Sequence, residues 1–301
     1  MQQTGTPLLR PCRRGEWSDE RWFDCGPGSV EIRQVAFRKA FARLRPMSPG
    51  AVFFLADAHL GAESKDLEAP REAQLHDFLD HLPGRAEALY VLGDLFDFWF
   101  EYRSSIPARH FHTLCALNRL RQSGVPVTYL GGNHDFWVGR FMRDELGIDV
   151  RENPLTLELQ GRRIWVHHGD GLIGGDLGYR LLKRVLRNPA CIWLYGLVHP
   201  DVGIPFAGWV SRWSRGSRDE RALDGPRLIG EIAEPRFHEG YDAVMIGHFH
   251  HMFEHHDAGK DFLVLGDWIR QMSYAVLEGG ILRLEQWKAG RSRSSAVRNL
   301  R

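Results

Sequence analysis

Five short apolar runs, each followed by a cluster of polar residues, constrain the fold of this 301-residue chain more than any other feature. The runs are rich in β-branched and aromatic residues and almost free of charge, as buried strands are. They cover residues 51–55, 88–92, 125–130, 164–166 and 243–246. Helical patterns lie between the first four runs, at about 70–82, 107–123 and 136–146. This alternation predicts an α/β fold with a largely parallel sheet.

Side chains that bind metals in other proteins follow each of these runs. The clusters are Asp57-Ala58-His59, Gly93-Asp94, Gly132-Asn133-His134-Asp135, His168-Gly169-Asp170 and Gly247-His248-Phe249-His250. In an open α/β sheet, ligands bind beyond the carboxyl ends of the strands. We therefore expect these clusters to meet in one cleft, although they are spread from residue 57 to residue 250.

The residue types in these clusters suit a pair of divalent ions. Two ions about 3.5–4 Å apart need a ligand that bridges them, and a carboxylate is the side chain best able to do so. We predict that Asp94 is the bridge and that Asp57 and His59 point at one ion. An amide oxygen and three imidazole nitrogens complete the set, from Asn133, His168, His248 and His250. Such a mixed nitrogen and oxygen set suits Mn²⁺, our first candidate, or Zn²⁺ or Fe²⁺, better than Mg²⁺ or Ca²⁺.

Taken together, the clusters resemble the calcineurin-like metallophosphoesterase family, whose pattern is D-x-H, G-D-x-x-D, G-N-H-[DE], H and G-H-x-H. The resemblance covers residues 51 to about 285. It implies a layered α/β/β/α sandwich with two bound divalent ions. The implied ligands are Asp57, His59, Asp94 and His250 for one ion, and Asp94, Asn133, His168 and His248 for the other.

The resemblance also implies roles for residues that hold no ion. The nucleophile would be a water between the two ions, since metal binding lowers the pKa of water towards about 7. His134 would lie beside the scissile phosphate and protonate the leaving oxygen, oriented by Asp135. Asp97 is expected to support a ligand rather than to be one. His167 precedes His168 directly, but the family pattern favours His168 as the ligand.

The alternation of strands and helices ends after Asp170, and residues 176–221 predict an inserted helical cap. This insert and the stretch Gly93–Trp99 are similar to the UDP-2,3-diacylglucosamine pyrophosphatases of lipid A synthesis. One departure concerns His134, because the best-known branch of that family has Arg at this position. The resemblance implies hydrolysis of the diphosphate of UDP-2,3-diacylglucosamine to UMP and 2,3-diacylglucosamine 1-phosphate (lipid X).

The composition of the cap suits both parts of such a substrate, since it mixes aromatic residues with Lys and Arg. Burial of acyl chains stabilises a complex by about 0.8 kcal/mol per CH₂ group. We expect the diphosphate to be met by Lys183, Arg184 and Arg187, and an acyl groove to be lined by Trp193, Phe206 and Trp209. Alternatively, the aromatic residues pack the cap onto the core and the cations form its solvated face.

Two other functions remain open on the sequence alone. A generic phosphodiesterase or nuclease would carry the same core motifs, but a nuclease needs a broad basic face. The formal net charge of +1 therefore argues against a nucleic-acid partner. A non-catalytic metal-binding scaffold would show broken ligand positions, and none is broken here.

The ends of the chain differ from the predicted metallophosphoesterase domain at 47–288. Residues 1–46 lack periodicity and predict a poorly ordered extension, with Met47 as an alternative start. Residues 289–301 predict a basic, disordered tail. Four cysteines without CxxC spacing indicate a reducing, cytoplasmic compartment.

Membrane contact is predicted from the cap. No apolar run approaches the roughly 18–20 residues of a membrane span. Exposed Trp and Leu beside Lys and Arg can instead lie at an anionic interface, so we expect peripheral association with the cytoplasmic face of the inner membrane. The sequence gives no indication of the oligomeric state.

Overall fold

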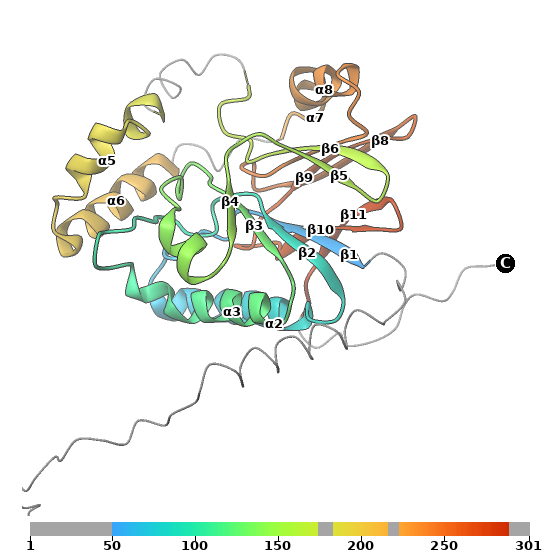
Figure 1. Ribbon diagram of the computed structural model, residues 1–301. Helices are drawn as coiled ribbons and strands as arrows, with labels where there is room; N and C mark the ends of the chain where they lie inside the picture. The colour runs from blue at the N-terminus through green and yellow to red at the C-terminus, as the bar shows by residue number, and fades with distance from the viewer. Residues whose placement is uncertain (1–49, 174–182, 216–222, 289–301) are drawn as a thin grey trace, which may run out of the picture. The chain divides into compact units, whose positions relative to one another are not determined.

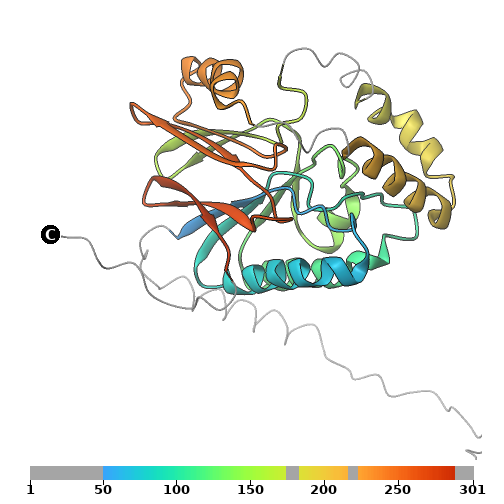
Figure 2. The same ribbon diagram turned by 180° about the vertical axis from the view of Figure 1, so that it is seen from behind.

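A computed structural model describes residues 50–173, 183–215 and 223–288, and two β-sheets form its centre (Figures 1 and 2). The strands of the first sheet are β1 Ala51–Leu55, β2 Ala86–Val91, β3 Val127–Leu130, β4 Asp149–Arg151, β10 Ser273–Glu278 and β11 Ile281–Gln286. Their order is β11-β10-β1-β2-β3-β4. Strands β1 to β4 are parallel to one another, whereas β10 and β11 run antiparallel at one side.

The second sheet has a parallel centre as well. Its strands are β5 Leu155–Leu159, β6 Arg162–His167, β7 Ala243–Ile246, β8 Met252–Asp257 and β9 Lys260–Leu265. They lie in the order β5-β6-β7-β9-β8. The register places Val166 opposite Met245, and β6, β7 and β9 are parallel. The carboxyl ends of these three strands therefore meet at one edge of the sheet.

Helices cover the outer face of each sheet, which gives four layers (Figure 1). Apolar side chains such as Phe54 and Met245 fill the space between the sheets. The helices α2 Lys65–His81 and α3 Phe111–Gln122 pack on the first sheet. The short helical segments α7 Gly225–Leu228, η3 Ile229–Ala233 and α8 Glu234–His238 pack on the second. The predicted α/β/β/α sandwich is confirmed.

The predicted helices match the structure only in part. Helix α2 begins at Lys65 rather than at Pro70, and α3 is preceded by the 3₁₀ turn η1, Ala108–His110. The helix predicted at 136–146 is wrong, because this region contains only the π-helical turn η2, Phe141–Glu145. The carboxylate of Glu101 accepts hydrogen bonds from the amides of Gly139 and Phe141 at 2.8 and 3.0 Å. These bonds fix the backbone just before η2 and at its first residue, where the periodicity predicts a continuous helix.

The described part of the cap contains a helical turn at 183–186 and the helices α5 Pro189–Tyr195 and α6 Pro200–Arg215 (Figure 2). They rest on aromatic side chains of the core, with the ring of Tyr195 4.7 Å from Phe100 and 4.9 Å from Trp137. The remaining parts of the predicted cap, 176–182 and 216–221, lie outside the described residues, as do 1–46 and 289–301. Among the helices described, none has the length and apolar character needed to cross a bilayer.

A buried histidine at the start of α3 makes stability sensitive to acid. His110 is only 3% exposed, and its ring lies 4.5 Å from that of Phe96. Burial, together with the charge of Arg109, lowers the pKa of His110 to about 3. An unfolded histidine has a pKa of about 6.5. As the pH falls below about 6.5, the unfolded chain binds a proton that the folded chain does not, so stability is lost.

We expect His110→Phe to remove this part of the acid sensitivity, because phenylalanine has no group that protonates. Between pH 7 and pH 4.5, the wild type should lose about 2–3 kcal/mol more unfolding free energy than the variant does. Urea unfolding of both proteins at the two pH values measures this difference. Equal losses in the two proteins would contradict the assignment.

Candidate functional site

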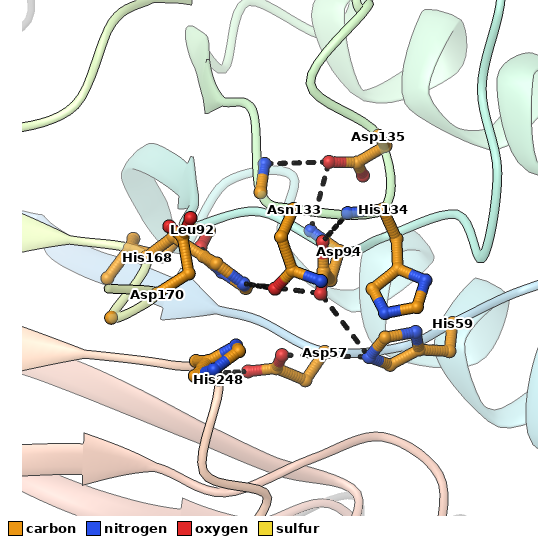
Figure 3. A network of polar contacts seen from close by, with 12 residues as sticks. Asp57, His59, Leu92, Asp94, Asn133, His134, Asp135, His168, Asp170 and His248 are labelled. Carbon is orange, nitrogen blue, oxygen red and sulfur yellow. Dashed lines mark hydrogen bonds and ion pairs between the residues drawn. The ribbon is translucent and has the colours of Figure 1, made fainter. Parts of the chain in front are cut away.

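The polar clusters all follow strands whose carboxyl ends lie at one edge of the sandwich. Asp57, Asp94 and Asn133 come after β1, β2 and β3 of the first sheet. His168 and His248 come after β6 and β7, which are parallel neighbours in the second sheet. The structure thus brings ligand-type residues from both sheets together, as predicted (Figure 3).

The loops that carry these residues have an unusual backbone. Asp57, His59, Asp94, His248 and His250 all have φ values between 44° and 71°. Residues other than glycine rarely adopt such values, which cost on the order of 1–3 kcal/mol each and persist only where the surroundings enforce them. Hydrogen bonds provide this enforcement: the amide of His59 donates to the carbonyl of Asp94, at 2.9 Å, and the amide of His248 donates to the carboxylate of Asp57, at 2.8 Å.

A first group of ligand atoms comes from Asp57, His59 and His250. The Nε2 atoms of the two histidines are 3.2 Å apart. Oδ1 of Asp57 lies 3.7 Å from Nε2 of His59 and 3.6 Å from Nε2 of His250. This oxygen is buried and accepts no hydrogen bond from the described part of the chain. A buried, unsatisfied carboxylate oxygen facing two imidazole nitrogens calls for a cation between them.

A second group comes from Asp94, Asn133, His168 and His248. Nε2 of His168 lies 3.1 Å from Oδ1 of Asn133 and 3.2 Å from Oδ2 of Asp94. One ligand-type atom from each of Asp94, His168 and His248 lies within 4.8 Å of the other two. Nδ1 of His168 is 2.8 Å from the carbonyl oxygen of Leu92 and must donate to it. When a divalent ion takes the place of the second ring proton, the lone pair of Nε2 points towards the group.

Asp94 belongs to both groups. Its Oδ2 lies 3.2 Å from Nε2 of His168 in the second group and 3.6 Å from Nε2 of His59 in the first. The other oxygen, Oδ1, accepts a hydrogen bond from the amide of His134 at 2.8 Å. An oxygen placed in this way can bridge two ions. Figure 3 shows Asp94 between the residues of the two groups.

The spacing within both groups fits a coordinated ion. Two atoms that each bind one ion at about 2.1 Å are about 3.0 Å apart in an octahedral site and about 3.4 Å apart in a tetrahedral one. The distances between ligand-type atoms of Asp57, His59, Asp94, Asn133, His168 and His250 given above lie between 3.1 and 3.7 Å, and His248 completes the second group within 4.8 Å. The donors combine imidazole nitrogens with carboxylate and amide oxygens, as Mn²⁺, Zn²⁺ and Fe²⁺ prefer. The residues present therefore fit a pair of divalent ions.

The electrostatics of the site also favour cations. Burial disfavours a charge on Asp94, but His168 and His134 outweigh it and hold the pKa of this carboxyl well below its usual value. Burial likewise opposes protonation of His168, yet Asp94 raises the pKa of His168 to about 10. The carboxylate of Asp94 therefore stays ionised and available to a cation even though it is buried. A divalent ion and a proton compete for such a place.

Comparison with known families agrees with this geometry. The profile of the calcineurin-like phosphoesterase family matches residues 51–252, which contain every residue of both groups. The chain belongs to this family. It is a metal-dependent hydrolase, as the recognised motifs predict.

Relatives that share one name align with most of the chain. A UDP-2,3-diacylglucosamine hydrolase of Porphyromonas gingivalis is 33% identical over 253 residues, which cover 78% of this chain and 96% of the relative. Proteins of the same name from Aeromonas hydrophila and Pseudomonas putida are 32% and 30% identical, and the alignments cover 98% and 92% of their lengths and 78% and 73% of this chain. Among solved structures, a Vps29 mutant from Entamoeba histolytica gives a TM-score of 0.38 at 15% identity, covering 78% of this chain and 97% of Vps29.

His134 lies beside the first group of this phosphoesterase centre. Its ring is edge-on to that of His59, with the centroids 4.7 Å apart. Nδ1 of His134 is 3.1 Å from the carbonyl oxygen of Asp97 and 3.5 Å from its carboxylate. The carboxylate of Asp97 is also 3.4 Å from Nδ1 of His59. Asp97 therefore lies beside Nδ1 of both rings, and its role as a support rather than a ligand stays a prediction.

The prediction that Asp135 orients His134 needs correction. The carboxylate of Asp135 is fully buried and is used elsewhere. Its hydrogen-bond donors are the amides of Gly132, Asp94 and Phe96 and the hydroxyl of Tyr129. Asp135 thus joins the loop after β3 to the loop after β2. It holds the backbone of the centre, and Asp97 supplies the contact that orients the ring of His134.

The adjacent residues His167 and His168 have different surroundings. His168 faces the second group, as described above. Nδ1 of His167 accepts a hydrogen bond from the amide of Gly169 at 2.7 Å. The ring of His167 stacks on that of Trp165, with centroids 5.5 Å apart and planes 7° apart. The structure therefore places His168 rather than His167 among the ligand-type residues.

The cations predicted to meet the substrate have partners of their own. Nζ of Lys183 lies 2.6 Å from Oδ2 of Asp170, in the loop that carries His168. The guanidinium of Arg187 lies over the ring of Phe136, 5.6 Å from its centroid. Arg184 is exposed. Lys183 and Arg187 therefore attach the cap to the loops of the metal centre.

The aromatic residues predicted to form an acyl groove lie on the outside of the cap. Trp193 is 68% exposed, and Phe206 and Trp209 are each 58% exposed. The rings of Phe206 and Trp209 stack on each other with centroids 6.2 Å apart. Other aromatic residues attach the cap to the core, chiefly Tyr195. The alternative in which aromatic residues pack the cap onto the core therefore describes Tyr195. It does not describe Trp193, Phe206 and Trp209, which are exposed.

Two further polar residues of the centre were missed from the sequence. Asn153 accepts a hydrogen bond from the amide of His168, at 3.0 Å, and donates to the carbonyl of Gly131, at 2.7 Å. It lies in a loop without any pattern that would have marked it. Asp267 lies close behind His250. The sequence does contain a signal for Asp267, because Gly266-Asp267 follows an apolar run just as Gly93-Asp94 does.

Proposed function

We propose that this phosphoesterase hydrolyses the diphosphate of UDP-2,3-diacylglucosamine and releases UMP and 2,3-diacylglucosamine 1-phosphate. The observation that carries the chemistry is the pair of ligand groups that share Oδ2 of Asp94. The substrate is inferred from the relatives of that name, which align with most of the chain, and from the mixed aromatic and basic cap.

Asp57, His59, Asp94 and His250 would hold one ion, and Asp94, Asn133, His168 and His248 the other. Mn²⁺ is the ion we propose first. When bound, such ions lower the pKa of a water molecule and neutralise charge on phosphate oxygens. The intact ligand set argues against a non-catalytic scaffold. The residues of the chain must then place the diphosphate in line with that water and supply a proton to the leaving phosphate oxygen.

His134 is the residue that we propose for proton transfer. Since a carbonyl oxygen only accepts, Nδ1 of His134 must donate to Asp97, which directs the other ring nitrogen away from this contact. Burial lowers the pKa of His134 to about 4, so the ring is neutral at pH 7 without substrate. The negative charge of a bound diphosphate would favour the protonated ring. His134 would then donate its proton to the leaving phosphate oxygen.

The cap would recognise the rest of the substrate. Lys183 and Arg187 lie beside the loops of His168 and His134, where we place the diphosphate. The described cap also carries a set of large apolar side chains that are each at least 58% exposed, which we call the apolar cap face. It consists of Trp193, Leu194, Leu197, Val202, Phe206 and Trp209. We assign this face to the acyl chains and to the bilayer from which they come, which makes the protein peripheral to the inner face of the membrane.

The proposed reaction is tested by measuring UMP release from UDP-2,3-diacylglucosamine in the presence of Mn²⁺. The same enzyme is assayed on bis-p-nitrophenyl phosphate and on single-stranded DNA. We expect kcat/KM to be far higher for the lipid-linked nucleotide than for either of the others. Comparable rates on all three would favour a generic phosphodiesterase or nuclease instead.

The apolar cap face gives a second test. We expect the combined change of Trp193, Phe206 and Trp209 to Ser to lower kcat/KM for UDP-2,3-diacylglucosamine at least about tenfold, because each large side chain contributes about 1.5–3 kcal/mol when buried. Hydrolysis of bis-p-nitrophenyl phosphate should change little. Ile281→Ser is a matched control, since Ile281 is 60% exposed on β11. Equal losses on both substrates would mean that the cap only supports the fold.

A further inference from the structure

Asp267 is a carboxylate at the metal-site edge that does not belong to either ligand group. It follows β9, and β9 is the parallel neighbour of β7, the strand that leads to His248 and His250. Its carboxyl end therefore lies at the same edge of the second sheet. Asp267 is 3% exposed, so its charge is buried. Buried charges are costly unless they are paired or hydrogen-bonded.

The backbone around Asp267 holds its side chain in one orientation. Oδ1 accepts hydrogen bonds from the amides of three successive residues, Ile269, Arg270 and Gln271, at 3.1, 2.8 and 3.0 Å. The carbonyl of Asp267 accepts from the amide and the hydroxyl of Ser273, at 3.0 and 3.1 Å. The second carboxylate oxygen, Oδ2, then faces Nδ1 of His250 at 3.9 Å. The turn thus satisfies one oxygen and directs the other at a ligand-type ring.

His59 and His168 have a comparable partner behind the ring. Nδ1 of His168 donates to the carbonyl of Leu92, and Nδ1 of His59 faces the carboxylate of Asp97. In both residues, Nε2 is the atom that faces the metal groups. A carboxylate or carbonyl behind a metal-bound histidine fixes the orientation of the ring and makes its other nitrogen a stronger ligand. Asp267 occupies the corresponding place behind His250.

We infer that Asp267 is a positioning residue for the ion held by Asp57, His59 and His250. This inference rests on the two-ion centre of the proposed function. The separation of 3.9 Å exceeds a direct hydrogen bond, so in this conformation Asp267 acts through its charge. That charge favours the ring orientation with Nδ1–H towards Asp267 and Nε2 towards Oδ1 of Asp57. Asp267 should therefore affect the binding affinity for this ion only. The affinity for the ion held by Asn133 and His168 should stay the same.

Asp267→Asn separates the effect on the ion from the effect on the turn, because the amide oxygen of Asn can still accept the three backbone hydrogen bonds. Mn²⁺ titration of the metal-free protein, followed by electron paramagnetic resonance, measures each ion. We expect the affinity for one of the two ions to fall about 10–100-fold. At limiting Mn²⁺ we expect the wild type to give the spectrum of a coupled pair of ions and Asp267→Asn to give that of an isolated ion. The thermal unfolding midpoint of the metal-free protein should stay the same.

Asp261→Asn is the control, since it makes the same chemical change in β9, at a carboxylate that pairs with Arg162 and His256 rather than with His250. It should leave Mn²⁺ binding unaltered. If Asp267→Asn folds poorly, Asp267→Ser allows the same comparison, because its hydroxyl can accept in the turn. Unchanged affinity for both ions in either variant would overturn the role of Asp267. Wild-type protein that binds only one ion would instead refute the two-ion centre itself.

Discussion

Replacing Gly132 by alanine is expected to remove metal from the centre and abolish most of the activity. A Cβ atom at Gly132 would lie 2.1 Å from Oδ1 of Asp94 and 2.7 Å from its backbone nitrogen. Two hydrogen bonds hold Asp94 in place: its Oδ1 accepts one from the amide of His134, and its own amide donates one to the carboxylate of Asp135. The added methyl group must therefore displace the carboxylate that both ligand groups share.

The loss of rate should be roughly 10³-fold, since ions supply several kcal/mol of transition-state stabilisation and each 1.36 kcal/mol is worth a factor of ten. Metal content is measured by mass spectrometry after dialysis, beside the rate of UMP release. Gly230→Ala is the matched control, because nothing lies within 4 Å of a Cβ atom there. A Gly132→Ala protein that keeps two ions and normal activity would show that Asp94 is not the bridge.

The layered fold and the convergence of the clusters could be predicted because each relevant strand is apolar and ends in residues of ligand type. Parallel strands place such ends at a common edge, whatever their distance along the chain. The weakest strands could not be found in this way. For example, β4, Asp149–Arg151, has only three residues, two of them charged and exposed. β8, Met252–Asp257, alternates poorly because it carries two histidines and two acids.

The partners of the supporting carboxylates could not be predicted, because they depend on how distant loops pack. Asp135 directly follows His134, and adjacency favoured a contact between them. In the folded chain the side chain of Asp135 turns inward to Tyr129, while Asp97 reaches His134 from a different loop. Asp267 was missed for another reason. Its strand-end Gly-Asp signal was present, but nothing in the sequence alone placed β9 beside β7.

His134→Ala is expected to lower kcat by about 10²–10⁴-fold, the range for a lost general acid, while the protein keeps its metal. The backbone amide of His134 donates a hydrogen bond to Oδ1 of Asp94, and this bond survives the substitution. The ring itself lies beside His59 and Asp97 at the border of the first group. Removal of the ring should therefore slow proton transfer to the leaving phosphate oxygen more than it weakens the binding of the ions.

The metal content of this variant decides between two roles. Ligand-type atoms of His59, Asp97 and His134 lie within 4.8 Å of one another, so a cation bound there would make His134 a ligand. In that case His134→Ala would lose metal together with activity, and added Mn²⁺ would restore part of the rate. If His134 acts on the phosphate, the variant keeps two ions and excess Mn²⁺ does not restore the rate. His134→Gln should then recover little, because an amide can donate a hydrogen bond to the phosphate but cannot transfer a proton to the leaving oxygen.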